Sequence, residues 1–229
     1  LSSTLGMLIV ASANDFLTIF VGIEISAFSS YALVAFRKSD DKSSEAGAKY
    51  LLIGAFSSAL TLYGISLIYA LTGSITFEGV NAFLVGIQNG VIEGNYEELV
   101  FISSLFIIAG LGFKIAVVPF HAWAPDVYEG APTPVTALLA AASKAMGFVA
   151  LFKVFIFTLE PFSEEWRLIL GIIALASMTV GNLAALSQED MGRMLAYSSI
   201  AQAGYILIAF PALTEDAVSG AIAHTMVHA

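Results

Sequence analysis

The sequence predicts an all-α polytopic membrane protein, and three observations support that prediction. Hydrophobic residues make up 58% of the 229 residues and charged residues only 12%, whereas an ordinary soluble domain is about 25% charged. The mean hydropathy is +0.87. The apolar residues form long continuous stretches and do not alternate with polar ones, as they would in the strands of a closed barrel. Because lipid satisfies no backbone polar groups, each stretch is expected to be a helix.

A membrane span needs about 20 mostly apolar residues, and the chain divides into several such stretches. Spans are expected at 1–13 (partial), 16–36, 47–72, 98–119, 133–158, 167–187 and 194–210, and a further partial helix is expected from about 217. The segment 79–97 is expected to be a connector at a membrane surface. We expect residues 1–229 to form one transmembrane domain of a longer protein, cut within one helix and ending within another.

The charges of the loops predict the orientation of these helices. Consecutive loops alternate between the two ends of the bundle, and one end receives the basic residues Arg37, Lys38, Lys42 and Arg193. The loops of the other end carry Glu78, Glu93, Glu97, Glu98, Glu160, Glu164, Glu165, Glu215 and Asp216, against Arg167 alone. By the positive-inside rule, the basic end is cytoplasmic or its topological equivalent.

Composition excludes several functions for this chain. The net charge of −9 argues against a nucleic-acid partner, which requires clustered basic residues. The sequence has no cysteine, so these residues cannot form disulfides, ligate iron–sulfur clusters, attach haem covalently or perform thiol catalysis.

A short repeat indicates internal symmetry. Residues 31–36 read YALVAF at the cytoplasmic end of one predicted helix, and residues 205–210 read YILIAF at the outer end of another. The same pattern in opposite orientation is typical of an inverted-topology repeat. Coincidence between two apolar six-residue segments is the alternative.

Three ionisable residues within the predicted spans are candidates for function, because a charge inside the membrane costs at least about 2.5–3.5 kcal/mol. Lys144 lies about 11 residues into its helix, or roughly 16 Å, and cannot reach either surface. Glu24 is also near mid-depth. Lys114 precedes a cluster of prolines that begins at Pro119 and includes Pro125, so a helix break is expected between Lys114 and Trp123. A lysine that pairs with freed carbonyls at a kink is the alternative for Lys114.

Other polar residues in the spans have weaker functional readings. Lys153 is near the outer end of its helix, where a surface anchor that extends its amine to water is the favoured interpretation. Lys49 is near a helix start, and an anchor and a functional role are equally supported. His224 and His228 share a helix face and favour the lining of a hydrated path over metal binding, because no further ligand is nearby.

Longer motifs resemble a known family. The segment GFKIAVVPFHAWAPDVYEGAPTPVTALLAAASK (112–144) resembles the signature of the antiporter-like, proton-translocating membrane subunits of respiratory complex I and its relatives. Within that family, GIEISAFSSYALVAF (22–36) and SEAGAKYLLIGAFSSALTLYG (44–64) are similar to subunit N of NADH–quinone oxidoreductase. Ile23 stands where the other antiporter-like subunits usually have tryptophan.

The resemblance implies an inverted-repeat bundle in which this chain covers about helices 4 to 11 of fourteen. It implies that Glu24, Lys49, Lys114 and Lys144 form a proton relay, with His224 and His228 along the pathway. It also implies that FMN, iron–sulfur clusters and quinone are bound by other subunits and that this chain carries no redox centre. The expected partners are the other membrane subunits, the lipid bilayer and protons, in a prokaryotic plasma membrane or an equivalent energy-transducing membrane.

Two alternatives remain open at this stage. One is a homologous subunit of a multisubunit cation/proton antiporter or of a membrane-bound hydrogenase, with the same relay and a different driving reaction. The other is a passive membrane scaffold, in which the lysines only pair with neighbouring helices or lipid.

Overall fold

The computed structural model describes residues 1–94 and 96–228, so Asn95 of the connector and Ala229 lie outside the described residues. The α-helices are α1 (Ser2–Ser12), α2 (Phe16–Val34), α3 (Asp41–Thr72), α4 (Phe77–Gln88), α5 (Glu97–Ile115), α6 (Trp123–Gly130), α7 (Thr133–Leu138), α8 (Lys144–Leu151), α9 (Ser163–Ala185), α10 (Met191–Leu207), α11 (Ala209–Ala212) and α12 (Glu215–His228). Two π-helical turns, η1 (Leu139–Ser143) and η2 (Phe152–Ile156), flank α8, and a 3₁₀ turn, η3 (Glu160–Phe162), precedes α9.

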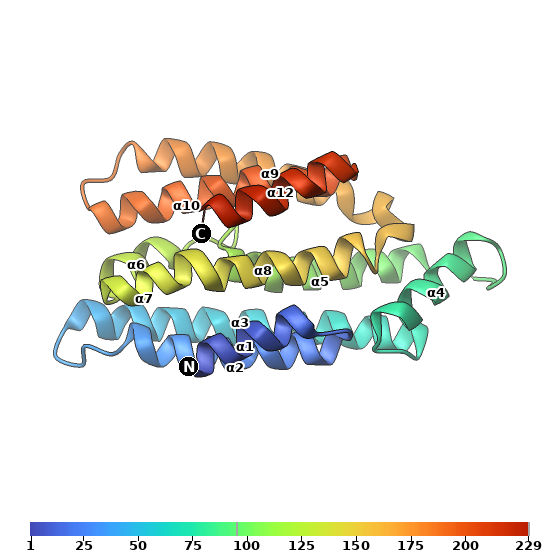
Figure 1. Cartoon of the computed structure of the whole chain (residues 1–229), viewed down its shortest axis with the longest axis horizontal. Coiled ribbons are helices and arrows are strands. Elements are labelled where there is room, and N and C mark those ends of the chain that lie inside the picture. Colours follow the sequence, from blue (N-terminus) through green and yellow to red (C-terminus); the bar gives the residue numbers. More distant parts are fainter. Residues whose placement is uncertain (95, 229) are drawn as a thin grey trace.

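The all-α prediction is confirmed. Six helical runs of the described residues are long and apolar enough to cross a membrane: Phe16–Val34, Asp41–Thr72, Glu97–Ile115, Thr133–Ile156, Glu160–Ala185 and Met191–Ala212. In Figure 1 the helices lie along one common axis in three tiers. Helices α1 to α3 form one edge, α5 to α8 the middle, and α9, α10 and α12 the other edge.

The alternation of loops between the two ends follows the predicted pattern. The α2–α3 loop, the α6–α7 junction and the α9–α10 loop all lie at the left end in Figure 1. Helix α4 and the α8–α9 connection lie at the right end. The basic loop residues therefore gather at one end of the bundle and the acidic loops at the other, and we call these the basic end and the acidic end.

Helix α3 begins earlier than its hydrophobicity predicted. It starts at Asp41 and not near 47, because the Asp40 side chain caps it by accepting a hydrogen bond from the Lys42 backbone N–H at 3.1 Å. The apolar run marks only the part of a helix that lies in lipid. The cap adds about two turns of polar helix, so Lys49 lies well inside α3.

The connector 79–97 is more ordered than its polar sequence indicated. Residues 77–88 form α4, whose start is capped by the Thr76 hydroxyl. Val80 and Leu84 are fully buried one turn apart, which fixes this short helix against the bundle. The side chain of Asn81 donates a hydrogen bond to the Thr158 carbonyl at 3.1 Å.

The predicted helix break is confirmed. Helix α5 ends at Ile115, Ala116 adopts a left-handed conformation with φ +56°, and α6 begins at Trp123. Side chains satisfy backbone groups near the break: the Val118 N–H donates to the Ser177 hydroxyl, and the Trp123 indole donates to the Phe113 carbonyl, both at 3.0 Å. Irregular backbone at membrane depth requires such partners.

The two helices that carry the short repeat run in opposite directions. Helix α2 runs toward the basic end and α10 away from it (Figure 1). Each belongs to a tight antiparallel pair, α1 with α2 and α9 with α10. A Cβ added to Gly6 would lie 2.5 Å from the Gly22 carbonyl oxygen, and one added to Gly204 would lie 2.8 Å from the Met178 nitrogen, so both pairs pack backbone against backbone. The opposite directions are those of an inverted repeat.

Candidate functional site

A small cavity beside the helix break contains two of the predicted residues. Glu24 of α2 and Lys114 of α5 both line it, together with Ser57, Ser58 and Thr61 of α3. Lys114 is 5% exposed, and its amine has no hydrogen-bond partner among the described residues. The Ser58 hydroxyl donates a hydrogen bond of 2.5 Å to the Glu24 carboxylate. The cavity therefore places a carboxylate and an unpartnered amine in one small space, which apolar side chains also line.

Lys144 occupies a second buried site, at the start of α8 directly after the π-helical turn η1. Its side chain is buried, and its amine donates hydrogen bonds to the Ser199 carbonyl at 2.8 Å and to the Ser199 hydroxyl at 2.5 Å. One turn further along α8, a Cβ added to Gly147 would lie 2.6 Å from the Ile115 side chain and 3.4 Å from that of Lys114. The helices of the two buried lysines are thus in direct contact.

The two histidines lie on α12, which packs against α10 and α8. The ring of His224 forms a 2.7 Å hydrogen bond with the Gln202 side chain. His228 lines a narrow cavity with Lys144 and Thr225, and its Nε2 is buried without a partner among the described residues. Within residues 1–94 and 96–228, no three His, Cys, Asp or Glu side chains are placed to hold a metal ion.

Lys49 lies apart from both buried sites. Its side chain is 42% exposed, and its amine pairs with Glu45 at 2.7 Å and with Asp126 at 2.6 Å. The structure therefore places it in a surface ion-pair network at the basic end and not in the cavities that Lys114 or Lys144 line.

The surface-anchor interpretation of Lys153 is wrong. Its amine folds back onto the end of α1 and donates to the carbonyls of Val10, Ala11 and Ala13, at 3.2, 2.7 and 2.7 Å. The last carbonyls of a helix lack intrahelical partners, which makes them acceptors for a nearby ammonium group. Lys153 thus caps α1 from η2.

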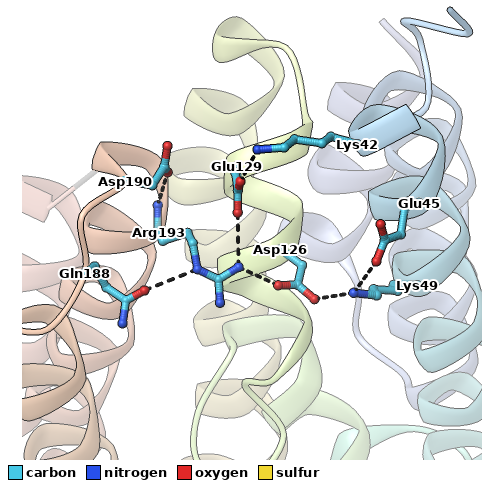
Figure 2. A network of polar contacts seen from close by, with 8 residues as sticks. All are labelled: Lys42, Glu45, Lys49, Asp126, Glu129, Gln188, Asp190 and Arg193. Carbon is cyan, nitrogen blue, oxygen red and sulfur yellow. Dashed lines mark hydrogen bonds and ion pairs between the residues drawn. The ribbon is translucent and has the colours of Figure 1, made fainter. Parts of the chain in front are cut away.

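The ion-pair network that includes Lys49 joins three helices (Figure 2). Asp126 of α6 accepts hydrogen bonds from Lys49 of α3 and from Arg193 of α10, both at 2.6 Å. Glu129, one turn further along α6, pairs with Lys42 at 2.6 Å and with Arg193 at 3.1 Å. The network therefore holds α6, the second half of the interrupted helix, between α3 and α10.

The charge of these two carboxylates is stabilised by their partners, and α6 lies outside the six candidate spans. Partial burial raises the pKa of the Asp126 carboxyl, but the hydrogen bonds from Lys49 and Arg193 together outweigh it and hold the pKa below its usual value. The hydrogen bonds from Lys42 and Arg193 lower the pKa of Glu129 in the same way. Both groups are therefore ionised at neutral pH.

This network was not predicted from the sequence, because residues 120–132 lie between two predicted spans, 98–119 and 133–158. The three-residue spacing of Asp126 and Glu129 was the available signal, since residues three apart share one face of a helix. The partners Lys42, Lys49 and Arg193 come from distant segments, and nothing in the sequence connects them to α6.

The fold and the buried sites define a class of protein. An interrupted helix with a buried lysine, flanked by helix pairs of opposite direction, is characteristic of transporter-type polytopic membrane proteins. The chain belongs to the family described as NADH:quinone oxidoreductase/Mrp antiporter, TM, whose profile matches residues 13–229. The resemblance inferred from residues 112–144 is thereby confirmed, and the chain is an integral membrane protein.

Similar proteins include subunits of different oxidoreductases. The chain is 44% identical over 227 residues to NADH-quinone oxidoreductase subunit N of Desulforamulus reducens. This alignment covers 99% of this chain and 46% of that protein. It is 45% identical over 229 residues to F(420)H(2) dehydrogenase subunit N of Methanosarcina mazei. That alignment covers 100% of this chain and 45% of that protein. The chain therefore spans about half the length of these relatives.

Similarity to a solved structure agrees with the sequence relatives. A chain of respiratory complex I from Thermus thermophilus with bound aureothin matches with a TM-score of 0.76 and 34% sequence identity. The match covers 99% of this chain and 48% of that chain.

Proposed function

We propose that the protein containing this chain is a proton-translocating membrane subunit of a complex I-type oxidoreductase, which transfers electrons from NADH or a related donor to quinone. The observation that carries the proposal is the pair of buried lysines, Lys114 and Lys144, on contacting helices beside an interrupted helix. A buried amine needs a reason, because its charge is costly inside a membrane. Proton transfer supplies that reason.

In this proposal Glu24, Lys114 and Lys144 form the relay, and His228 extends it toward α12. Glu24 influences Lys114 across their shared cavity: a carboxylate about 7 Å from an amine contributes roughly 2.4 kcal/mol at an effective dielectric constant of about 20. Carrying one proton against about 150 mV costs roughly 3.5 kcal/mol. The two energies are of the same order, so in this proposal movement of Glu24 relative to Lys114 shifts the protonation equilibrium of the amine by an amount comparable with the work of carrying one proton.

The redox chemistry belongs to other subunits in this proposal. These residues include no cysteine to ligate an iron–sulfur cluster, which supports assigning the clusters to partner subunits, and the proposal assigns FMN and quinone to the partners as well. Relatives of nearly equal identity are named for NADH and for F(420)H(2), which supports a membrane subunit that serves different electron donors. The proposed location is a prokaryotic plasma membrane or an equivalent energy-transducing membrane, with the other membrane subunits as neighbours.

Substitution of Lys144 in the full-length, assembled complex tests the proposal. Lys144→Met removes the charge and retains the bulk, whereas Lys144→Arg retains a charge that cannot release its proton, because the pKa of arginine exceeds about 12. We expect both variants to assemble and both to lose quinone reductase turnover and vesicle acidification by about tenfold or more. Lys38→Met, on the exposed α2–α3 loop, is the control and is expected to behave as the native protein.

Two outcomes would contradict the proposal. Normal acidification by the Lys144→Met variant would favour the alternative that the protein is a passive membrane scaffold. Near-normal acidification by Lys144→Arg would show that a fixed charge suffices, so that Lys144 would not be a proton carrier.

A further inference from the structure

The closest approach within the helix pair α1–α2 gives a reference point for Glu24. A Cβ added to Gly6 of α1 would lie 2.5 Å from the Gly22 carbonyl oxygen and 2.6 Å from the Ser26 backbone nitrogen. The glycine of the first helix thus meets a carbonyl of the second helix and the nitrogen of the residue one turn later. Glu24 lies midway between these two residues in the sequence, and it lines the cavity of the buried Lys114.

The pair α9–α10 contains the same contact. A Cβ added to Gly181 of α9 would lie 2.8 Å from the Tyr197 carbonyl oxygen and 2.6 Å from the Ala201 backbone nitrogen. Ser199 lies midway between these two residues in the sequence. It therefore occupies on α10 the position that Glu24 occupies on α2.

This correspondence differs by one residue from that of the short sequence repeat. Alignment of YALVAF with YILIAF pairs Glu24 with Ser198, whereas the backbone contacts pair it with Ser199. The side chain that the structure places against a buried lysine is that of Ser199, which accepts hydrogen bonds from the Lys144 amine at its carbonyl and its hydroxyl, at 2.8 and 2.5 Å. The backbone contacts thus match two positions that each face a buried lysine.

The two positions differ in the charge that they present. Glu24 brings a carboxylate to the cavity of Lys114, whereas Ser199 offers Lys144 two neutral oxygens. A carbonyl only accepts hydrogen bonds, so it holds the charged amine. A hydroxyl donates as well as accepts, so it bonds to the amine in either protonation state. Ser199 is therefore suited to hold Lys144 before and after the amine loses its proton.

The elements packed on α8 bring no carboxylate to Lys144. Helix α8 packs on α1, α5 and α12. Helix α1 has no titratable side chain, α5 brings Lys114 to the surface of α8, and α12 brings His228 to the Lys144 cavity. The carboxylates of α5 and α12 are exposed in the first turns of those helices. Within residues 1–94 and 96–228, Lys144 forms no ion pair.

We propose that Ser199 is a positioning residue for Lys144, the neutral counterpart of Glu24 in the second helix pair, which holds the amine without a counter-charge so that its proton is released readily. This inference rests on the proposed function and adds the residue that determines how tightly Lys144 holds its proton. Ser199 itself neither gains nor loses a proton.

Three substitutions separate the hydroxyl and the charge at this position, and all three leave the backbone carbonyl in place. Ser199→Thr retains the hydroxyl, Ser199→Ala removes it, and Ser199→Asp introduces the carboxylate that the first helix pair has at Glu24. A carboxylate favours the charged amine, and loss of a hydrogen-bond acceptor disfavours it. The Asp and Ala variants should therefore displace the pH dependence of proton transfer in opposite directions, which a purely structural role would not do.

The experiment measures donor-driven acidification of membrane vesicles and quinone reductase turnover, as a function of pH, in the full-length protein within its assembled complex. At about pH 7 we expect Ser199→Asp to lower acidification about tenfold or more and Ser199→Ala several-fold, with Ser199→Thr within about twofold of the native rate. The pH profile should move up by about one unit or more in the Asp variant and down by about one unit in the Ala variant.

Two matched controls accompany these variants. Ser198→Asp adds the same charge one residue away on α10, at the half-buried position that the short sequence repeat pairs with Glu24. Ser103→Ala removes the hydroxyl of a buried serine of α5 that donates to the Val100 carbonyl of its own helix. Both controls are expected to retain the native pH profile.

The outcomes separate this inference from the proposed function. If Lys144→Met abolishes acidification while Ser199→Asp and Ser199→Ala keep the native pH profile, the relay stands and the role of Ser199 is wrong. An equal displacement by Ser198→Asp would also contradict it. If Ser199→Asp fails to assemble, the hydroxyl decides: a displaced profile in Ser199→Ala that Ser199→Thr restores supports the role, and equal profiles in these two variants overturn it. Normal acidification by Lys144→Met would overturn the proposed function itself.

Discussion

Lys114 and Lys144 are both buried, but their amines differ in their hydrogen-bond partners. Lys144 donates to two oxygens of one serine, whereas the Lys114 amine has no partner among the described residues and shares a cavity with Glu24. An amine without a hydrogen-bond partner is easily re-paired when its surroundings shift. Lys114 is therefore the member of the pair that responds most directly to Glu24.

This difference predicts the effect of neutralising Glu24. Glu24→Gln retains an oxygen that accepts the Ser58 hydrogen bond and removes only the charge. We expect normal assembly and a loss of vesicle acidification of about tenfold or more, since the lost attraction is roughly 2.4 kcal/mol at about 7 Å. Glu78→Gln, at an exposed site of α4, is the control. A native acidification rate for Glu24→Gln would show that the relay does not require the charge of this carboxylate.

Lys153 leads to a prediction about stability. Lys153→Met deletes the three hydrogen bonds to the end of α1 and leaves the Val10, Ala11 and Ala13 carbonyls without this partner. We expect a loss of about 1–2 kcal/mol in the free energy of unfolding, the usual range for bonds to a charged donor at a half-exposed site. Thermal denaturation of the purified protein in detergent measures it. An unchanged transition relative to Lys38→Met would show that the cap contributes nothing.

At the scale of elements, α6 is the helix most dependent on charge. It has only eight residues, too few to be stable alone, and it is held by Asp126 and Glu129. Because their pKa values are lowered in the folded protein, the two carboxylates stabilise it fully above their ordinary pKa of about 4. That contribution is lost as the pH falls through the lower, folded values.

The pH dependence of stability tests this role of α6. The double variant Asp126→Asn/Glu129→Gln is expected to melt about 2–4 °C lower than the native protein at pH 7. The difference should begin to shrink below about pH 4, where the carboxylates of the unfolded chain become protonated, and should vanish as the pH falls through the lowered pKa values of the folded protein. Glu97→Gln/Glu98→Gln, at exposed positions of α5, is the matched control. A difference that stays constant from pH 7 to pH 3 would exclude the ion pairs as its cause.

Some elements were predictable from the sequence and others were not, and the reasons are physical. The break before Trp123 was predictable because proline acts locally, by removing a donor and clashing with the preceding turn. The start of α3 was not predicted, because a cap at Asp40 depends on one hydrogen bond and not on hydrophobicity. The depth of Lys144 followed from counting residues along a helix. Its partner Ser199 did not, since 55 residues separate them and only the tertiary fold brings them together.

At the scale of the whole molecule, the opposite directions of α2 and α10 lead to a prediction about symmetry. We expect the pair α1–α2 to superpose on the pair α9–α10 after a half-turn about an axis in the membrane plane. An experimental structure of the full-length protein provides the measurement. Superposition that requires an axis along the membrane normal would make the repeat parallel and contradict the prediction.

The backbone contacts within the two antiparallel pairs determine where the molecule is stiff. Because Gly6 and Gly204 bring main chain close to main chain, α1 lies tightly against α2 and α9 against α10, and we expect each pair to move as one unit. We expect bending to occur in the irregular segments of the middle tier, at residues 116–122 and at the π-helical turns η1 and η2, which flank α8. A force on either edge of the bundle would then act on the break that follows Lys114 and on the turn η1 that directly precedes Lys144.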